Sequence, residues 1–179
     1  DDNNTACFNS VDASLWFINA AFQYFHATND SKTFVKRLLP AIEEIINGYE
    51  NGTLYNIRAD IDGLITAGGP QTQLTWMDAK YDGIAFTPRY GKAVEINALW
   101  YNNLCLLADL YSELAQKSKT PHKETKKSLH YQEMADDVKS SFCNIFWNKQ
   151  KNYLNDCITT EGAVDDSLRP NQIYAVSLR

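Results

Sequence analysis

The sequence predicts an all-α fold built of antiparallel helical hairpins, with long loops gathered at one end. Three observations support this prediction. Apolar residues recur with the 3.6-residue period of a helix in four long segments. Short turns join these segments in pairs, which places consecutive helices side by side. Between the pairs lies a long stretch without helical periodicity, and a connection of that kind in a compact domain is usually functional or disordered.

The first pair of helices is predicted over about residues 10–27 and 31–49. Pro40 lies inside the second helix and is expected to kink or break it. That helix is expected to end near Gly48, before the strong turn signal of Asn51-Gly52. The first helix is apolar around much of its circumference, as expected of a helix packed on two sides. Its main apolar face consists of Val11, Leu15, Ile18, Phe22 and Phe25.

From Gly52 to about Val94 the helical period disappears. Apolar and polar residues alternate around Tyr55, Ile57 and Ile61, which predicts a short hairpin or an extended strand. The stretch contains too many apolar and aromatic residues to be disordered. We therefore expect an ordered, functional loop segment.

The second pair of helices is predicted over about residues 95–117 and from Thr120-Pro121 to Trp147, with the proline at the first helical position. A second irregular stretch follows, and Pro170 begins a fifth helix. Two complete hairpins and the start of a third do not close on themselves. We therefore interpret residues 1–179 as a single partial domain, the middle portion of a larger helical domain.

The composition limits the partners of the chain. Among 179 residues, 44% are hydrophobic, enough for one sizeable core. The net charge is −5, with a pI near 5.1. This balance argues against nucleic acid or an anionic membrane as the main partner, because both require clustered Lys and Arg. No apolar run approaches the roughly 20 residues needed to span a bilayer.

The cysteines and acidic residues predict no metal and no cofactor. Cys7, Cys105, Cys143 and Cys157 have no spacing typical of a metal site. Residues 60–63 begin like a calcium loop, but the rest of that pattern is absent. No signal peptide is visible, which favours a cytoplasmic location. The chain starts without Met, so a processed or trimmed start remains open.

Four motifs carry a family resemblance: FNSVDASLWF (8–17), LTWMDAK (74–80), TPRYGKAVEINALWYN (87–102) and LRPNQIYAVSL (168–178). They resemble the amylo-α-1,6-glucosidase domain of glycogen debranching enzymes and its bacterial and archaeal relatives. The motifs follow the family's order and span nearly the whole chain. The resemblance implies an (α/α)6 toroid of six outer and six inner helices, with the active site at its mouth.

The activity that this resemblance implies is hydrolysis of α-1,6-linked glucose at the branch points of glycogen or a related α-glucan, with inversion. The implied partners are the α-glucan, such as limit dextrin, and the remainder of the same toroid. The chain is shorter than a full toroid. The family's catalytic base, a glutamate, is expected in a segment after residue 179.

Asp78 is the general acid that the resemblance implies. Glycoside hydrolysis needs two carboxyl groups, and the one that protonates the leaving oxygen requires a raised pKa near neutral pH. Burial against aromatic surface raises a carboxyl pKa, and Trp76 and Tyr81 are close in sequence. From composition alone, a loop Asp is more often a turn former or a cap. Glu95, Glu161, Asp165 and Asp166 are candidates for the base by residue type only, and none is assigned.

Several further residues are expected to bind substrate. Asp12 and Glu95 are either acids favoured by a helix dipole or carboxylates that accept hydrogen bonds from glucose hydroxyls, as the resemblance implies. Trp76 is a candidate for stacking on a sugar face, whereas Trp16 and Trp100 are expected in the core.

For the remaining polar candidates two interpretations stay open. Lys80, Arg89 and Arg169 either donate to sugar hydroxyls or hold carboxylates in ion pairs. Asn171 either binds substrate or caps the last helix. Two alternatives to the debranching activity also stay open. One is a fragment that binds α-glucan without hydrolysing it, and the other is a different toroid α-glucosidase, such as a trehalase-like enzyme.

Overall fold

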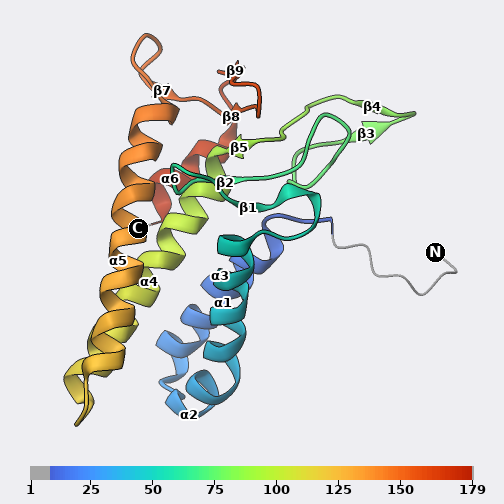
Figure 1. The fold of residues 1–179 in the computed structure, drawn as a ribbon. Helices are drawn as coiled ribbons and strands as arrows, with labels where there is room; N and C mark the ends of the chain where they lie inside the picture. Colours follow the sequence, from blue (N-terminus) through green and yellow to red (C-terminus); the bar gives the residue numbers. More distant parts are fainter. Residues whose placement is uncertain (1–8, 179) are drawn as a thin grey trace, which may run out of the picture.

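The computed structural model describes residues 9–178, which form a mostly helical fold with a few short strands (Figure 1). Helices α1 (Ala13–Thr28) and α4 (Val94–Lys117) run in one direction. Helices α3 (Leu39–Asn51) and α5 (His122–Phe146) run in the opposite direction, so that the helices form antiparallel hairpins. The long loops gather at one end of these hairpins, and α6 (Tyr174–Ser177) begins at that end. The predicted helical class and the predicted place of the loops are therefore confirmed.

Helix α1 begins at Ala13, later than expected, because the chain before it is tied to the long loop. The amide of Val11 donates to the carbonyl of Leu74 at 2.9 Å, and Asp12 is the N-cap. The helix ends where Asn29 adopts a φ of 53°, a left-handed conformation that Asn tolerates better than most residues.

The second expected helix is continuous but contains a π-turn. Helix α2 (Ser31–Thr33) leads into the π-helical segment η1 (Phe34–Leu38) and then into α3. The amide of Leu39 donates to the carbonyl of Phe34, five residues back. Pro40 follows directly, and its ring would clash with the carbonyl four residues back in a regular α-helix. The wider turn accommodates the proline, so the predicted kink takes the form of a π-turn.

The predicted end of this helix near Gly48 is wrong. Gly48 lies inside α3, which continues to Asn51. Gly52 then leaves the helical region with a φ of 87°, a conformation that glycine adopts without steric cost.

The long segment contains the predicted short hairpin, but two of the residues that suggested it lie outside the strands. Strands β1 (Arg58–Ala59) and β2 (Ile65–Thr66) pair antiparallel. The alternation through Tyr55 and Ile61 was misleading. Tyr55 lies in the 3-10 turn η2 (Leu54–Asn56) with a φ of 58°, and Ile61 is fully exposed at the hairpin tip. Turn-forming Asp and Gly residues between the strands decided the local structure.

A second hairpin was not predicted. Strands β3 (Lys80–Tyr81) and β4 (Ile84–Ala85) pair antiparallel and project away from the helices (Figure 1). The turn residues Asp82 and Gly83 have φ values of 47° and 78°. Positive φ at both central residues is typical of a type I′ hairpin turn, for which Asp-Gly is a strong signal.

A small sheet joins the start of α4 to the second irregular stretch. Strand β5 (Lys92–Ala93) pairs with β8 (Cys157–Ile158), which pairs with β9 (Val164–Asp165), all antiparallel. Gly91 precedes β5 with a φ of 90°, and a Cβ there would lie 2.3 Å from the carbonyl oxygen of Ile158. This close approach of two backbones requires glycine.

Helix α4 begins within one residue of its predicted start. Helix α5 begins after Pro121, which is its N-cap rather than its first helical residue. It ends where β6 (Trp147–Asn148) pairs with β7 (Tyr153–Leu154). The last predicted helix starts as the 3-10 turn η3 (Pro170–Ile173) and continues as α6. None of the helices over residues 9–178 is both long enough and apolar enough to cross a membrane.

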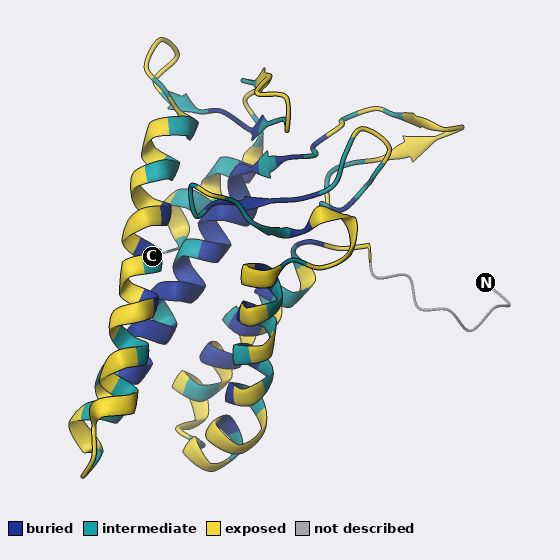
Figure 2. Cartoon of the chain, in the orientation of Figure 1, coloured by how far each residue is buried: buried dark blue, intermediate teal, exposed yellow. Residues whose placement is uncertain are grey.

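The core is centred on α4, which is buried over much of its upper half (Figure 2). Trp100 is completely buried there, as predicted. Trp16 is half-buried and meets the ring of Tyr174 edge-on, with ring centroids 5.4 Å apart. On α1, Phe17 and Tyr24 are 40% and 39% exposed within the described part of the chain. Packing of α1 on two sides therefore stays a prediction.

Candidate functional site

Predicted site residues from separate parts of the chain meet at the loop end of the helices. Asp12 occupies the N-cap position of α1, Glu95 lies in the first turn of α4, and Asn171 lies in η3 directly before α6. The loop that contains Asp78 runs between β2 and β3 at the same end. Its Leu74 carbonyl accepts the amide of Val11, which joins this loop to the start of α1.

Asp78 closes a tight turn. The amides of Leu74 and Thr75 donate to its Oδ2 atom at 2.9 and 3.1 Å. The interpretation of this residue as a turn former is therefore confirmed. The same bonds fix the direction of a carboxyl group that remains half-buried.

The environment of Asp78 favours its protonated form. Burial raises the pKa of the Asp78 carboxyl above its ordinary value, because a buried carboxylate loses hydration. The amides of Thr75 and Leu74 lower the pKa in part without cancelling the effect of burial. A carboxyl with a raised pKa can carry a proton at a pH where an ordinary Asp is ionised.

Several residues close to Asp78 in sequence have exposed apolar side chains. Trp76 is 56% exposed, and three residues of the β3–β4 hairpin, Tyr81, Ile84 and Phe86, are exposed further. Tyr81 lies directly opposite Ile84 in the hairpin. The Phe86 amide donates to the carbonyl of Ala79, which continues the pairing. Since side chains alternate along a strand, Tyr81, Ile84 and Phe86 lie on one face.

A buried ion cluster lies beneath this loop, centred on Arg89. The guanidinium donates to both oxygens of Glu95, at 2.5 and 2.6 Å, and its Nε donates to Asp156 Oδ2 at 2.7 Å. The side chains of Arg89, Glu95 and Asp156 are 0%, 2% and 2% exposed. Burial alone would lower the pKa of Arg89, but the two carboxylates raise it, so the guanidinium stays charged.

Asp156 joins this pair to the last helix. It also accepts from Arg169 Nη1 at 2.7 Å and from Asn171 Nδ2 at 2.9 Å. Arg169 reaches Asp165 as well, at 2.6 Å. Asp156 was missed by the sequence analysis, because one Asp before a short strand has no distinctive spacing. We use the name Arg89 cluster for Arg89, Glu95, Asp156, Arg169 and Asn171.

The Arg89 cluster touches the turn that contains Asp78. Arg89 Nη1 donates to the hydroxyl oxygen of Thr75 at 3.2 Å. On the other side of the turn, Asn171 Nδ2 lies 3.5 Å from the sulfur of Met77. The hydroxyl of Thr87 donates to the carbonyl of Met77 at 2.7 Å. The turn is therefore held at both Thr75 and Met77.

These contacts decide between several of the interpretations left open above. Arg89 and Arg169 hold carboxylates in ion pairs. Lys80 does not: over residues 9–178 its ammonium group has no ion pair and makes a weak bond of 3.4 Å to the carbonyl of Gln71. Asn171 does not cap the last helix. It is completely buried and bonds Asp156, and its Oδ1 has no hydrogen-bond partner within the described residues.

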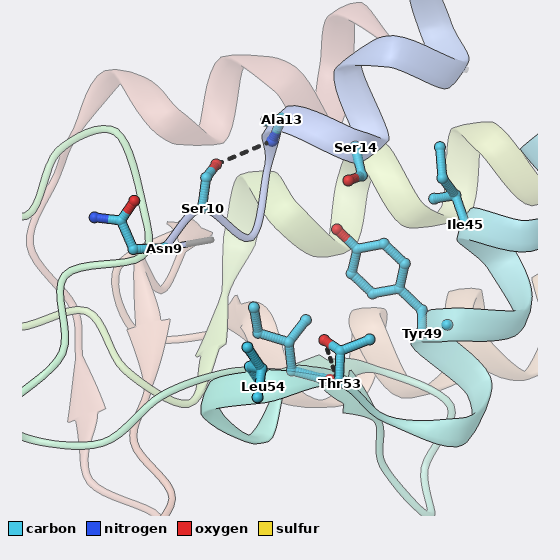
Figure 3. Close-up of a pocket in the computed structure, with 10 residues that line it drawn as sticks. Asn9, Ser10, Ala13, Ser14, Ile45, Tyr49, Thr53 and Leu54 are labelled. Atoms are coloured by element: carbon cyan, nitrogen blue, oxygen red, sulfur yellow. Dashed lines mark hydrogen bonds between the residues drawn. The ribbon is translucent and has the colours of Figure 1, made fainter. Parts of the chain in front are cut away.

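Two residues close to Asp12 in sequence, Ser10 and Ala13, line an open hollow at the start of α1 (Figure 3). The Oδ1 atom of Asp12 accepts from the hydroxyl of Ser10 at 2.5 Å, and Asp12 makes no side-chain cap bond with α1. The hollow, of about 470 Å³, lies between α1 and the end of α3. Its lining mixes polar side chains, such as Ser10 and Ser14, with apolar ones, such as Leu54.

Asp60 and Asp62, the acidic residues of the segment that begins like a calcium loop, form ion pairs with basic side chains of the same chain. Lys92 Nζ lies 3.1 Å from Asp60 and 2.6 Å from Asp62, and Arg58 lies 3.1 Å from Asp60. In the part of the chain that the structure describes, no three His, Cys, Asp or Glu side chains gather as metal ligands would.

Comparison with known proteins identifies the family. The family model described as amylo-alpha-1,6-glucosidase matches residues 1–179. The chain belongs to the amylo-alpha-1,6-glucosidase family. The resemblance seen in the four motifs is therefore confirmed. No curated protein matches the chain.

The fold of this amylo-alpha-1,6-glucosidase family member is similar to part of a solved enzyme. The crystal structure of a GH78 family rhamnosidase of Bacillus sp. GL1 matches with a TM-score of 0.63 and 16% identity. The match covers 94% of this chain and 17% of that one. At this identity the similarity concerns the fold alone.

Proposed function

We propose that Asp78 is the general acid of an inverting glucosidase site that hydrolyses α-1,6-linked glucose at branch points of glycogen or a related α-glucan. The observation that carries this proposal is the state of its carboxyl. It is half-buried, it is oriented by two amides, and burial raises its pKa. A general acid needs this combination, because it must hold a proton near neutral pH and present it in a fixed direction.

The second carboxylate of the reaction is proposed to come from another part of the protein. Glu95 is fully engaged with Arg89, and Asp165 is engaged with Arg169. Glu161 accepts from the hydroxyl of Tyr90 at 3.0 Å, and Asp166 pairs with Lys151 at 2.5 Å. An inverting base must instead be free to activate a water, with the two carboxyl groups about 6.5–9.5 Å apart.

We place the chain in the middle of an (α/α)6 toroid. The common start of α1, α4 and α6 at the loop end suits the inner helices of such a toroid (Figure 1). The exposed Phe17 and Tyr24 of α1 provide a surface for a further helical hairpin. The rest of the toroid is thus the proposed partner of this chain, and a cytoplasmic location is part of the same proposal.

For the substrate, we propose contacts that use the accessible candidates. Trp76 has the exposure to stack on a sugar ring, and Lys80 and Asp12 can bond hydroxyl groups. Arg169 keeps 20% of its side chain exposed. Arg89 and Glu95 are closed off from solvent in the cluster, so their proposed role is to support the site from beneath.

The test is the Asp78→Asn variant of the full-length protein, assayed for glucose released from branched limit dextrin. We expect release to be abolished while the fold is kept, since Asn cannot donate a carboxyl proton. Asp82→Asn is the matched control, because Asp82 lies in the nearby β3–β4 turn, where Asn also tolerates positive φ. Retained release by Asp78→Asn would contradict the proposal. A panel of α-linked disaccharides and branched glucans then defines the preferred linkage.

A further inference from the structure

Thr75 lies between the Arg89 cluster and Asp78 and contacts both. Its amide donates to Asp78 Oδ2 at 3.1 Å, and its hydroxyl oxygen accepts from Arg89 Nη1 at 3.2 Å. One residue therefore bonds the proposed general acid through its backbone and the buried guanidinium through its side chain.

The donor on the buried side is fixed in place. Arg89 is completely enclosed, and Glu95 and Asp156 accept from its three nitrogens. A guanidinium held in this way has little freedom to reorient, because its fork of N–H groups is planar and rigid. The oxygen of Thr75 is thus held by a group that has little freedom to reorient.

This arrangement constrains the hydroxyl proton of Thr75. A hydroxyl has one hydrogen and two acceptor lone pairs. Because Arg89 donates to the oxygen, the hydrogen must point away from the guanidinium. The hydroxyl of Thr75 is also among the groups that lower the pKa of Asp78 by hydrogen bonding. The Thr75 amide already donates to that carboxyl, so we infer that the carboxyl of Asp78 also accepts the hydroxyl hydrogen.

The opposite side of the turn is anchored through other side chains. Met77, the neighbour of Asp78, accepts from the Thr87 hydroxyl through its carbonyl and lies against Asn171 through its sulfur. With both sides held, a change at the Thr75 hydroxyl alters the contacts of Asp78 without releasing the whole turn.

We propose that Thr75 is a positioning residue for Asp78, and that Arg89 holds its hydroxyl oxygen so that the hydroxyl proton and the amide both face the Asp78 carboxyl. This inference rests on the proposed function of Asp78. When the general acid gives its proton to the glycosidic oxygen, negative charge develops on its carboxyl. Donors already directed at that carboxyl stabilise this charge without reorganisation.

The experiment uses Thr75→Val and Thr75→Ser in the full-length protein, with limit dextrin as substrate and kcat and KM measured across pH. Valine keeps the branched shape and the amide but lacks the hydroxyl. We expect kcat to fall about tenfold with KM unchanged, as for loss of one hydrogen bond to a developing charge. The basic limb of the kcat profile, which reports the general acid, should move to higher pH. Serine should restore both properties.

A direct titration gives a readout that does not depend on activity. In ¹³C NMR spectra with assigned carboxyl resonances, the Asp78 midpoint should be higher in Thr75→Val than in the wild-type protein and in Thr75→Ser. An unchanged pH profile and an unchanged Asp78 midpoint in a folded Thr75→Val protein would overturn the inference. If Asp78→Asn is inactive but Thr75→Val leaves the pH profile and the Asp78 midpoint unchanged, the proposed function stands and only the positioning role is refuted. Active Asp78→Asn would refute both.

Discussion

Both terminal nitrogens of Arg89 donate to Glu95, Nη1 to Oε1 at 2.5 Å and Nη2 to Oε2 at 2.6 Å, with neither side chain more than 2% exposed. This paired geometry fixes the first turn of α4 against the segment between β4 and β5. A buried ion pair is not by itself proof of high stability, because desolvation offsets much of the attraction. Removing one partner is nevertheless costly, since the other charge stays buried.

Glu95→Gln should therefore destabilise the protein strongly. Glutamine keeps the size of the side chain but cannot neutralise Arg89, and we expect a loss of about 3 kcal/mol in the free energy of unfolding. Urea denaturation measures this change. Glu113→Gln is the control on the same helix, because Glu113 pairs with Lys117 at 3.5 Å on the surface. That change should cost less than about 0.5 kcal/mol. Equal effects of the two variants would contradict the role of the buried pair.

Asp78→Asn should stabilise the protein at neutral pH. The pKa of Asp78 is raised in the folded state, so folding favours its protonated form. Its contribution to stability is complete below the ordinary pKa of 3.8 and is lost as the pH rises through the higher folded value. Asparagine does not ionise, so the variant keeps its stability as the pH rises. Its side-chain oxygen can still accept from the amides of Leu74 and Thr75. Urea unfolding at pH 7 and pH 3.5 should show a gain at pH 7 only. A variant less stable at pH 7 would show that the ionised carboxylate is net favourable.

Glu43 should have the opposite pH dependence. Burial alone would raise the pKa of this α3 residue, but hydrogen bonds from Lys127 of α5 and Tyr111 of α4 lower it overall. Its contribution is present above the ordinary pKa of 4.5 and disappears as the pH falls through the lower folded value. Since the pair is one-third exposed, Glu43→Gln should cost only about 1 kcal/mol at pH 7.

The control for this change is Glu44→Gln, because Glu44 is exposed on the same helix. Thermal or urea unfolding at pH 7 and pH 3 should show a difference between wild type and Glu43→Gln only at pH 7. A difference that persists at pH 3 would point to packing rather than charge.

Gly91→Ala should disrupt the start of α4. A methyl group there would meet the Ile158 carbonyl oxygen at 2.3 Å, at a φ of 90°. The backbones of β5 and β8 must move apart, so we expect a loss of about 2 kcal/mol or more. Gly69→Ala is the matched control, since no atom lies within 4 Å of the added carbon. Calorimetry should show a clear fall in Tm for Gly91→Ala and little change for Gly69→Ala.

The helices were predictable because burial gives them a period. The α4 sequence shows an apolar face, and its predicted start differs from the structure by one residue. The departures arose where another constraint outweighed periodicity. At the start of α1, Val11 uses its amide to bond Leu74, and around Pro40 the helix widens into a π-turn.

The site was predictable only in part. Motifs pointed to Asp78, Arg89 and Glu95, which the structure brings to one end of the helices. Asp156 had no such signal, because an ion pair between residues far apart in sequence leaves no periodic trace. The β3–β4 hairpin was missed although Asp82-Gly83 is a strong turn signal, because its strands are only two residues long and have no buried face.

The Arg89–Asp156 bond joins residues 67 positions apart, whereas α4 and α5 are neighbours along the chain. Contacts that close long loops form late in folding, and regions that depend on them open first under native conditions. We therefore expect the amides of Leu74 and Thr75 to exchange with deuterium before those in the middle of α4. The loop end would then fluctuate as a unit of its own, and the affinity for glucan would include the free energy of keeping it closed.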